Sequence, residues 1–371
     1  MLIYFGFSAL IAFAATTALL LFAEPSLLAA IHLVFALAAL PLIFAAIAHF
    51  IPVLTRSGDT PRMIRLAPLL LQLSGATVVL HFYAVLGLPA LAAAAAVGTL
   101  VSVCFALWMA SRARHALGTP HPGWRWYLAA LTFLALGLAL VPVMTCWPET
   151  RPALRLLHLH LNILGFIGLA AIGTLQVLLP TVLGGPDAAA TTRLRRDLPL
   201  AVVGVSTTAL GAAFWWPLSL FGAALLLVVA GRLGWSWWRR YGLRAITGDG
   251  ASAALAAALF GFVLMLILGA VHGVDLLNGH DAVLAFVAAF LLPLVTGALS
   301  QLLPVWRFPG RRTPEREQLR TVLAQGGAAR ALLFLAAGFL LAFGRSEGLA
   351  LMAVGVLHFA LQSVRAFCFP R

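Results

Sequence analysis

Apolar runs separated by short polar loops fill almost the whole chain, and this pattern admits few folds. Twelve of the runs are long enough to cross a bilayer, which takes about 20 residues of α-helix. They cover residues 2–22, 27–54, 63–86, 89–111, 125–147, 156–183, 199–217, 219–238, 252–273, 281–304, 328–344 and 347–367. Only 9% of the residues are charged, against about 25% in a soluble domain. Because a lipid-embedded backbone has to bond to itself, we predict an all-α polytopic membrane protein.

The basic residues follow every second apolar run, and all of them are arginines. The clusters are Arg56, Arg62 and Arg65; Arg112, Arg114 and Arg125; Arg193, Arg195 and Arg196; Arg239, Arg240 and Arg244; Arg307, Arg311, Arg312, Arg316 and Arg320; and Arg365 and Arg371. The alternate loops hold only Arg151, Arg155 and Arg345. Cytoplasmic loops carry the excess of positive charge, so we expect both termini in the cytoplasm and a multi-pass protein of the bacterial inner membrane.

The net charge of +13 does not indicate a nucleic-acid partner. A nucleic-acid binder gathers its basic residues in one patch or stripe. Here the arginine clusters are distributed over five loops and the C-terminal tail, where they set orientation in the membrane. The partner that this distribution predicts is therefore the lipid bilayer and not a nucleic acid.

Three of the runs share a pattern that predicts an internal repeat. The segments 27–54, 156–183 and 281–304 each have a histidine near their outer start and a proline near the cytoplasmic end, at Pro52, Pro180 and Pro304. The prolines are 128 and 124 residues apart. A fixed long period is typical of repeated structural units. We predict one transmembrane domain, residues 1–371, made of three pseudo-symmetric four-helix repeats at roughly 1–124, 125–250 and 251–371.

Six of the ten histidines fall at the same predicted depth, in the outer part of the membrane. They are His32, His81, His158, His160, His272 and His280. Ionisable residues within a bilayer are costly, and they usually serve a partner, an ion path or a cofactor. Any single histidine here also fits an interfacial residue or a hydrogen-bond donor between helices. For the neighbours His158 and His160 we favour ligation.

The spacing of His158 and His160 predicts two separate centres. Side chains at i and i+2 on a helix point about 200° apart, so these two imidazoles cannot easily share one metal. Imidazole is a common ligand of haem iron and of copper. Gly165, Gly168 and Gly173 follow on the same helix, and small residues allow either a neighbouring helix or a flat macrocycle to approach closely.

The segment around these histidines resembles a known signature. His158, His160, Gly165, Phe166, Gly173, Leu175 and Pro180 match H-x-H-x4-G-[FW]-x6-G-x-L-x4-P. This pattern is similar to the tenth-helix signature of the haem-copper oxidase subunit I superfamily, in its branch of microaerobic cytochrome oxidases and nitric oxide reductases. It resembles the shorter NnrS-type haem- and copper-containing membrane proteins equally well. The resemblance implies one or two b-type haems, with His158 as proximal ligand of the active-site haem and His160 as a ligand of a low-spin haem.

The chain departs from that superfamily in where its histidines lie. The family places its H-x-H on the tenth helix and its copper ligands on the sixth and seventh, two of them adjacent. Here the H-x-H lies on the sixth run, and no His-His pair occurs. Shifting the ligand set by one repeat restores a correspondence. His280 would then oppose His160 across a haem, and His32 with His81 would be a copper pair facing His158.

The proton chemistry narrows the function that the resemblance implies. Oxidases of this kind deliver protons through buried carboxylates, a lysine and a tyrosine. This chain has no lysine, and its acidic residues fall in loops or near the ends of the apolar runs. We therefore expect a non-pumping membrane redox protein that handles nitric oxide or oxygen and receives electrons from a donor protein or quinol. Any protons would come from the outer side.

Two other classes stay open at this stage. A haem- or copper-trafficking or accessory protein would share the histidines without turnover. A secondary transporter also uses long repeats and intramembrane polar residues, although its site usually lies near the midplane. Whether the chain is an enzyme is left open by the sequence.

The arginine distribution yields a labelling prediction. In a variant with Cys104, Cys146 and Cys368 replaced by serine, a cysteine introduced at Asn278 should react with an impermeant thiol reagent from the periplasmic side. A cysteine at Arg312 should react only after the membrane is opened, because its loop carries the cytoplasmic arginine cluster. The reverse pattern would contradict the topology and the common depth of the six histidines.

Overall fold

The computed structural model describes residues 1–23, 25–274 and 276–368, and this part of the chain is helical without any strand. Twelve described helical segments are long and apolar enough to span a membrane. They are Leu2–Phe22, Leu27–Thr55, Arg62–Phe82, Leu88–Arg114, Gly123–Cys146, Pro148–Val182, Ala190–Phe214, Trp216–Gly248, Gly250–His272, Asp281–Arg307, Pro314–Ala342 and Glu347–Cys368. Each corresponds to one predicted apolar run, so the all-α polytopic fold is confirmed.

The chain divides into two compact units. Unit 1 comprises Met1, Pro25–Thr174 and Ala188–Val229, and unit 2 comprises Leu2–Glu24, Leu175–Asp187 and Ala230–Arg371. Each is described below by itself. The single domain and the boundaries of the three repeats remain predictions.

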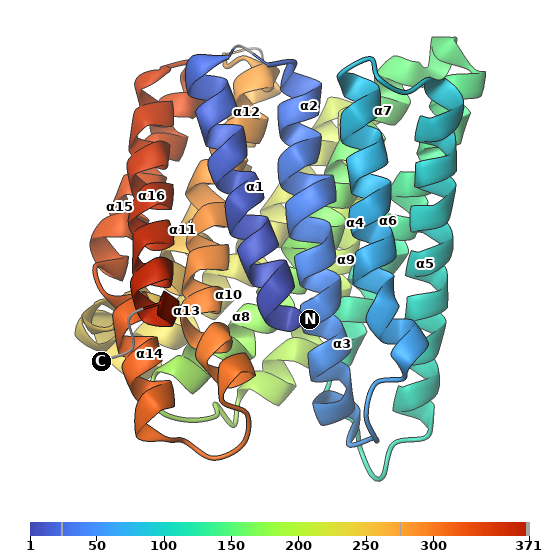
Figure 1. The fold of residues 1–371 in the computed structure, drawn as a ribbon. Coiled ribbons are helices and arrows are strands. Elements are labelled where there is room, and N and C mark those ends of the chain that lie inside the picture. The colour runs from blue at the N-terminus through green and yellow to red at the C-terminus, as the bar shows by residue number, and fades with distance from the viewer. Residues whose placement is uncertain (24, 275, 369–371) are drawn as a thin grey trace. The chain divides into compact units, whose positions relative to one another are not determined.

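Unit 1 contains the helices from α2 to the first part of α10. One span is built from α2 (Leu27–His32), η1 (Leu33–Ala39) and α3 (Leu40–Thr55), and α4 (Arg62–Phe82), α5 (Leu88–Arg114) and α6 (Gly123–Cys146) follow. The next span consists of η2 (Pro148–Thr150), α7 (Arg151–His160), η3 (Leu161–Gly168) and the start of α8 (Leu169–Val182). Then come α9 (Ala190–Phe214) and the start of α10 (Trp216–Gly248). Helix α5 packs against both α4 and α6, and it lies at the right-hand edge of Figure 1.

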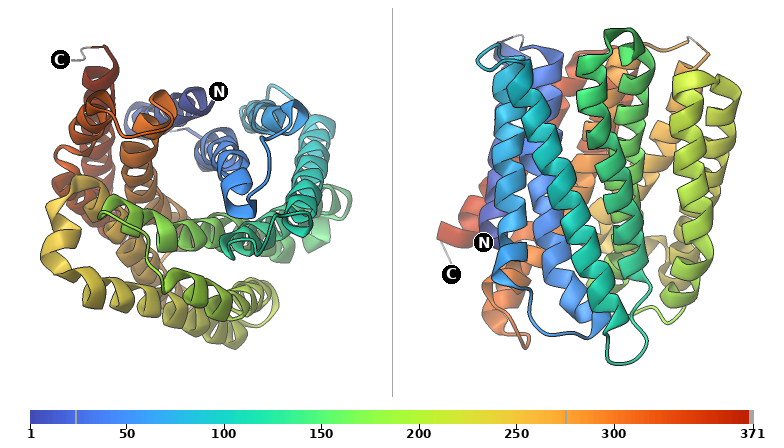
Figure 2. Two further views of the ribbon diagram at one scale, coloured as in Figure 1. Left: turned by 90° about the horizontal axis from the view of Figure 1, so that it is seen from below. Right: turned by 90° about the vertical axis from the view of Figure 1, so that its right-hand side faces the viewer.

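Unit 2 contains the remaining helices. They are α1 (Leu2–Phe22), the end of α8, the end of α10, α11 (Gly250–His272), α12 (Gly279–Phe286), η4 (Val287–Leu291), α13 (Leu292–Arg307), α14 (Pro314–Ala324), α15 (Gly327–Ala342) and α16 (Glu347–Cys368). Helix α11 packs against α13 and α15, and α1 packs against α13 and α16. Figure 2 shows the blue α1 beside the orange α13. The short helix α14 lies between Arg307 and Gln325, and its Arg320 pairs with Asp249 at 2.7 Å.

The three spans with the predicted repeat pattern all contain a π-helical stretch at a similar position. These stretches are η1 (Leu33–Ala39), η3 (Leu161–Gly168) and η4 (Val287–Leu291). Pro41 and Pro293 follow two of them, each 11 residues before the terminal proline of its span. A proline has no N–H to offer the preceding turn, which favours a local widening of the helix. Single-turn π segments within α-helices are frequent at functional sites.

A glycine of the neighbouring helix lies against the widened backbone of η1. The N–H of Leu40 donates to the carbonyl of Phe35, and Pro41 has no N–H, so the carbonyl of Ala36 loses its usual helical donors. Gly75 of α4 lies directly against that carbonyl, and a Cβ at this position would overlap the oxygen. The close approach of α4 to η1 therefore requires a glycine here.

We predict that Gly75→Ala destabilises the protein by about 1–3 kcal/mol, because the added methyl has no space beside a backbone carbonyl. Gly269→Ala in α11 is the matched control, since nothing lies within 4 Å of a Cβ built there. Thermal unfolding in detergent should show a lower Tm for the first variant and an unchanged or higher Tm for the second. Equal Tm values for Gly75→Ala and the wild type would show that the two helices are not packed this closely.

Candidate functional site

Three of the histidines predicted as metal ligands come together in unit 1. His32 ends α2 immediately before η1, His81 lies in the last turn of α4, and His158 lies on α7. The ring of His32 is close enough to both His81 and His158 for electrostatic interaction, and it packs on the ring of Phe82 at 4.6 Å. The structure thus brings the expected pair, His32 and His81, to the same end of unit 1 as His158.

The three imidazoles share one hydrogen-bonding arrangement. In each, Nδ1 lies within hydrogen-bond distance of a backbone carbonyl oxygen: His32 with Leu28 at 2.7 Å, His81 with Leu86 at 2.8 Å and His158 with Gly137 at 2.8 Å. A carbonyl oxygen only accepts, so Nδ1 carries the proton in each ring. In the neutral ring the lone pair is then on Nε2. Metal-bound histidines usually have this arrangement, with the second ring nitrogen donating to a carbonyl or carboxylate.

The orientation of His158 is further fixed by its surroundings on α6 and η3. Its partner Gly137 lies on α6, and the side-chain amide of Asn162 donates to the backbone carbonyl of His158 at 2.6 Å. A Cβ at Gly137 would come within 2.6 Å of that amide nitrogen. The glycine, the amide and the imidazole therefore form one tightly packed group.

His160 is anchored differently from His158. Its Nδ1 donates to the carbonyl of Leu156 on its own helix at 2.8 Å, whereas the partner of His158 is on α6. The two rings therefore have separate supports, and the expectation that they face different sides of the helix remains a prediction. Both are partly buried.

The glycines that follow the two histidines contact a helix. A Cβ at Gly165 would lie 2.7 Å from the Cβ of Phe133, and one at Gly173 would lie 2.7 Å from the Cβ of Trp126. Both aromatic residues belong to α6. At Gly165 and Gly173, the missing side chain therefore allows α6 to approach closely. It is a neighbouring helix, and not a macrocycle, that lies against these two glycines in the structure.

The remaining predicted ligand, His280, belongs to unit 2, and its side chain lies outside the described residues. Its pairing with His160 across a haem remains a prediction. His272, also in unit 2, donates from Nδ1 to the carbonyl of Leu277 at 2.8 Å.

The described histidines do not converge on a single metal position. Within residues 1–23, 25–274 and 276–368, no three His, Cys, Asp or Glu side chains are arranged to hold one ion. His32, His81 and His158 are therefore neighbours that do not form a three-ligand metal group in this arrangement.

The structure also shows a buried cation that sequence reasoning missed. Arg330 on α15 is 1% exposed, donates from Nη1 to Nδ1 of His358 at 3.2 Å, and stacks over the ring of Phe359 at 4.7 Å. The signal was present in the sequence, since Arg330 is a lone arginine just inside the apolar run 328–344. Its position near the end of that run made it resemble an ordinary flanking charge.

No family model, no curated protein and no solved structure matches this chain. The similarity of the His158–Pro180 segment to the haem-copper signature therefore stands on its residues alone. The local geometry of the histidines is an independent observation.

We predict that His32, His81 and His158 are Nδ1–H tautomers in the cofactor-free protein at neutral pH. His121 supplies a contrast within the same chain, because its Nδ1 accepts from the N–H of Gly123 at 3.2 Å and the proton must lie on Nε2. Burial lowers the pKa of His121, and the positive charge of Arg195 lowers it further, so this ring is neutral at pH 7. Two-bond ¹H–¹⁵N correlation spectra of ¹⁵N-histidine protein, assigned with single His→Gln variants, report the tautomers. Nε2–H forms at the three membrane histidines would contradict the anchoring.

Proposed function

We propose that the protein is a haem-binding, and in part copper-binding, membrane redox protein that handles nitric oxide or oxygen. The observation that carries the proposal is the set of membrane-embedded imidazoles of His32, His81 and His158, whose Nδ1–H groups are bonded to backbone carbonyls. This bonding places the lone pair of each neutral ring on Nε2. This donor set fits iron and copper, both of which accept imidazole nitrogen. The H-x-H signature supports the same class.

Each histidine has a proposed role. His158 would hold the iron of one b-type haem, and His160 would be a ligand of a second, low-spin haem. His32 and His81 would hold copper beside His158. When bound, such centres supply electron transfer and a position for a diatomic gas. The protein's own contribution is to orient the rings, through the carbonyls of Leu28, Leu86, Gly137 and Leu156.

We also propose that any protons reach the site from the outer face of the membrane, near which the histidines are predicted to lie. The described carboxylates of unit 1 are Asp59 in a loop, Glu149 in η2 and Asp197 near the start of α9. Asp197 is paired with Arg196 at 2.8 Å. Transfer of charge through hydrocarbon without titratable groups is strongly penalised. We therefore propose a non-pumping protein, and proton ejection coupled to turnover in reconstituted vesicles would contradict this part.

A trafficking or accessory role would use the same ligands without turnover. Such a protein would bind haem or copper and pass it to another protein instead of receiving electrons from a donor protein or quinol. Cofactor binding is common to both versions, so it is the first property to test.

We predict that the purified protein contains stoichiometric haem with a Soret band. His160→Ala should abolish the bis-histidine low-spin signature, and His158→Ala should abolish carbon monoxide binding, because each substitution removes a ligand atom. His115→Ala is the matched control: His115 has the same Nδ1–carbonyl bond, to Ser111 at 2.8 Å, but lies exposed at the end of α5. Optical spectra and metal analysis of the four samples decide the question. A protein without haem and without bound transition metal would refute the proposal and favour the secondary transporter.

A further inference from the structure

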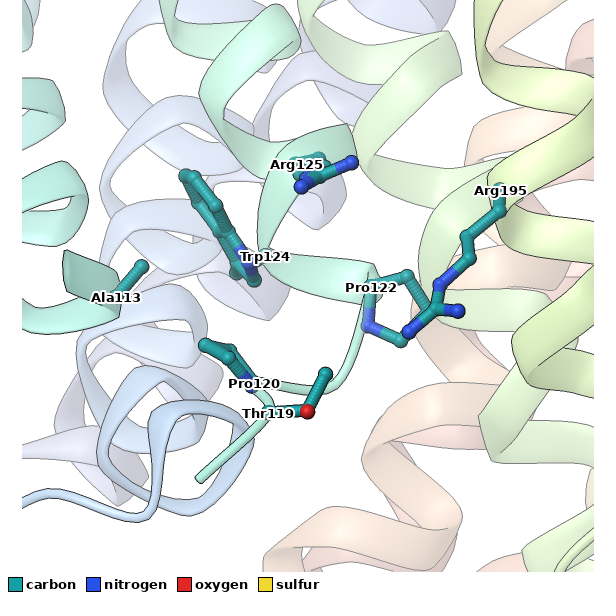
Figure 3. Close-up of a pocket in the computed structure, with 7 residues that line it drawn as sticks. All are labelled: Ala113, Thr119, Pro120, Pro122, Trp124, Arg125 and Arg195. Carbon is teal, nitrogen blue, oxygen red and sulfur yellow. The ribbon is translucent and has the colours of Figure 1, made fainter. Parts of the chain in front are cut away.

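A second site lies at the opposite end of unit 1 from the three histidines. A cavity of about 390 Å³ opens between the end of α5, the loop leading into α6 and the start of α9. Thr119, Trp124, Arg125 and Arg195 line it, and Figure 3 shows Arg195 extending toward the loop at Pro122. Helix α6 connects the two regions: it begins with the cavity residues Trp124 and Arg125, and Gly137 further along it holds His158.

The cavity has an excess of positive charge. Two guanidinium groups line it, and no carboxylate does. In the part of the chain that the structure describes, no ion pair joins Arg125 or Arg195 to a carboxylate, and Asp197, two residues after Arg195, is bonded to Arg196. The lowered pKa of His121, which is caused by burial and then by the charge of Arg195, is a further effect of this positive field.

Buried hydrogen bonds hold the two guanidinium-bearing segments at a fixed spacing. The indole N–H of Trp126, next to Arg125, donates to the carbonyl of Leu194, next to Arg195, at 2.9 Å. Trp126 and Leu194 are both fully buried. The backbone N–H of His121 donates to the carbonyl of Leu54 at 2.8 Å, which ties the loop to the end of α3. The cavity is therefore a built feature of unit 1.

We propose that this cavity binds a phosphate group, namely that of an anionic phospholipid head group. Guanidinium groups bind phosphate oxygens through strong charge-assisted hydrogen bonds. The hydroxyl of Thr119 can add a donor, and a tryptophan such as Trp124 is typical of the membrane interface. The volume lies within the range of small-ligand sites. Basic pockets between transmembrane helices are a recognised place for anionic head groups.

Lipid binding by the detergent-purified full chain tests this proposal. Native mass spectrometry would give the affinity for phosphatidylglycerol, with phosphatidylcholine as the neutral lipid and inorganic phosphate as a competitor. The test variant is Arg125→Gln with Arg195→Gln. The control is Arg62→Gln with Arg65→Gln, which removes the same charge from exposed positions at the start of α4, at the same end of unit 1.

The proposal expects phosphatidylglycerol to bind the wild type more tightly than phosphatidylcholine. One basic residue near an anionic membrane surface contributes about a fivefold change in affinity, so the test variant should lose about 25-fold and the control much less. Trp126→Phe should also weaken binding while both arginines remain, because it removes the bond that sets their spacing. Competition by inorganic phosphate would assign recognition to the phosphate alone, and its absence would assign it to the whole lipid.

Two results would overturn the proposal. One is an equal loss of affinity in the test and control variants, which would mean that only the total charge matters. The other is equal binding of the anionic and neutral lipids by the wild type. Thermal unfolding of all variants in detergent checks that each retains its fold, and the exposed positions of the four arginines make this the expected result.

Discussion

Every backbone N–H and C=O group inside a bilayer has to find a partner within the protein, and the rest of this structure depends on that requirement. It accounts for the twelve helical spans among the residues that the structure describes. It also means that each break in the helical hydrogen-bond pattern must be compensated by another contact. At η1 the carbonyl of Ala36 loses its usual donors, and the chain places Gly75 of α4 against it. Nearby carbonyls also accept bonds from side chains, as those of Leu28 and Gly137 do from His32 and His158.

The helices themselves could be predicted from the sequence because hydropathy and length are sufficient to define a spanning segment. The positions of the π segments within the spans, and the neighbours of each histidine, could not be predicted from the sequence. Pro41 and Pro293 marked two of the three π segments, but η3 has no proline at the equivalent place. Similarly, the sequence placed six histidines at one depth without showing which ones are neighbours. The grouping of His32, His81 and His158 depends on how α4 and α7 pack around η1 and α6, which is set by contacts between distant residues.

The hydrogen bonds of the histidine rings could not be predicted from the sequence either. Whether Nδ1 donates or accepts depends on which backbone atom lies beside it, as the contrast between His158 and His121 shows. Arg330 illustrates a different limit. An arginine near the end of an apolar run resembles a flanking charge, and only the packing of α15 against α16 shows that it is buried beside His358 and Phe359. The cavity brings together Arg125 at the start of α6 and Arg195 near the start of α9, which are about seventy residues apart in the sequence, so no local motif predicts it.

The carbonyl-anchored histidines have a consequence for the order of events during assembly. A ring whose Nδ1–H is already bonded to the backbone has lost most of its rotational freedom when the chain folds, before any ligand arrives. Preorganised donors bind with a smaller loss of entropy than mobile ones. Under the proposed function, such a chain would reach its final form in the membrane before it binds haem or copper, and cofactor binding would be a separate, later step. In a cell, the availability of cofactor would then set the activity of such a protein without setting its amount.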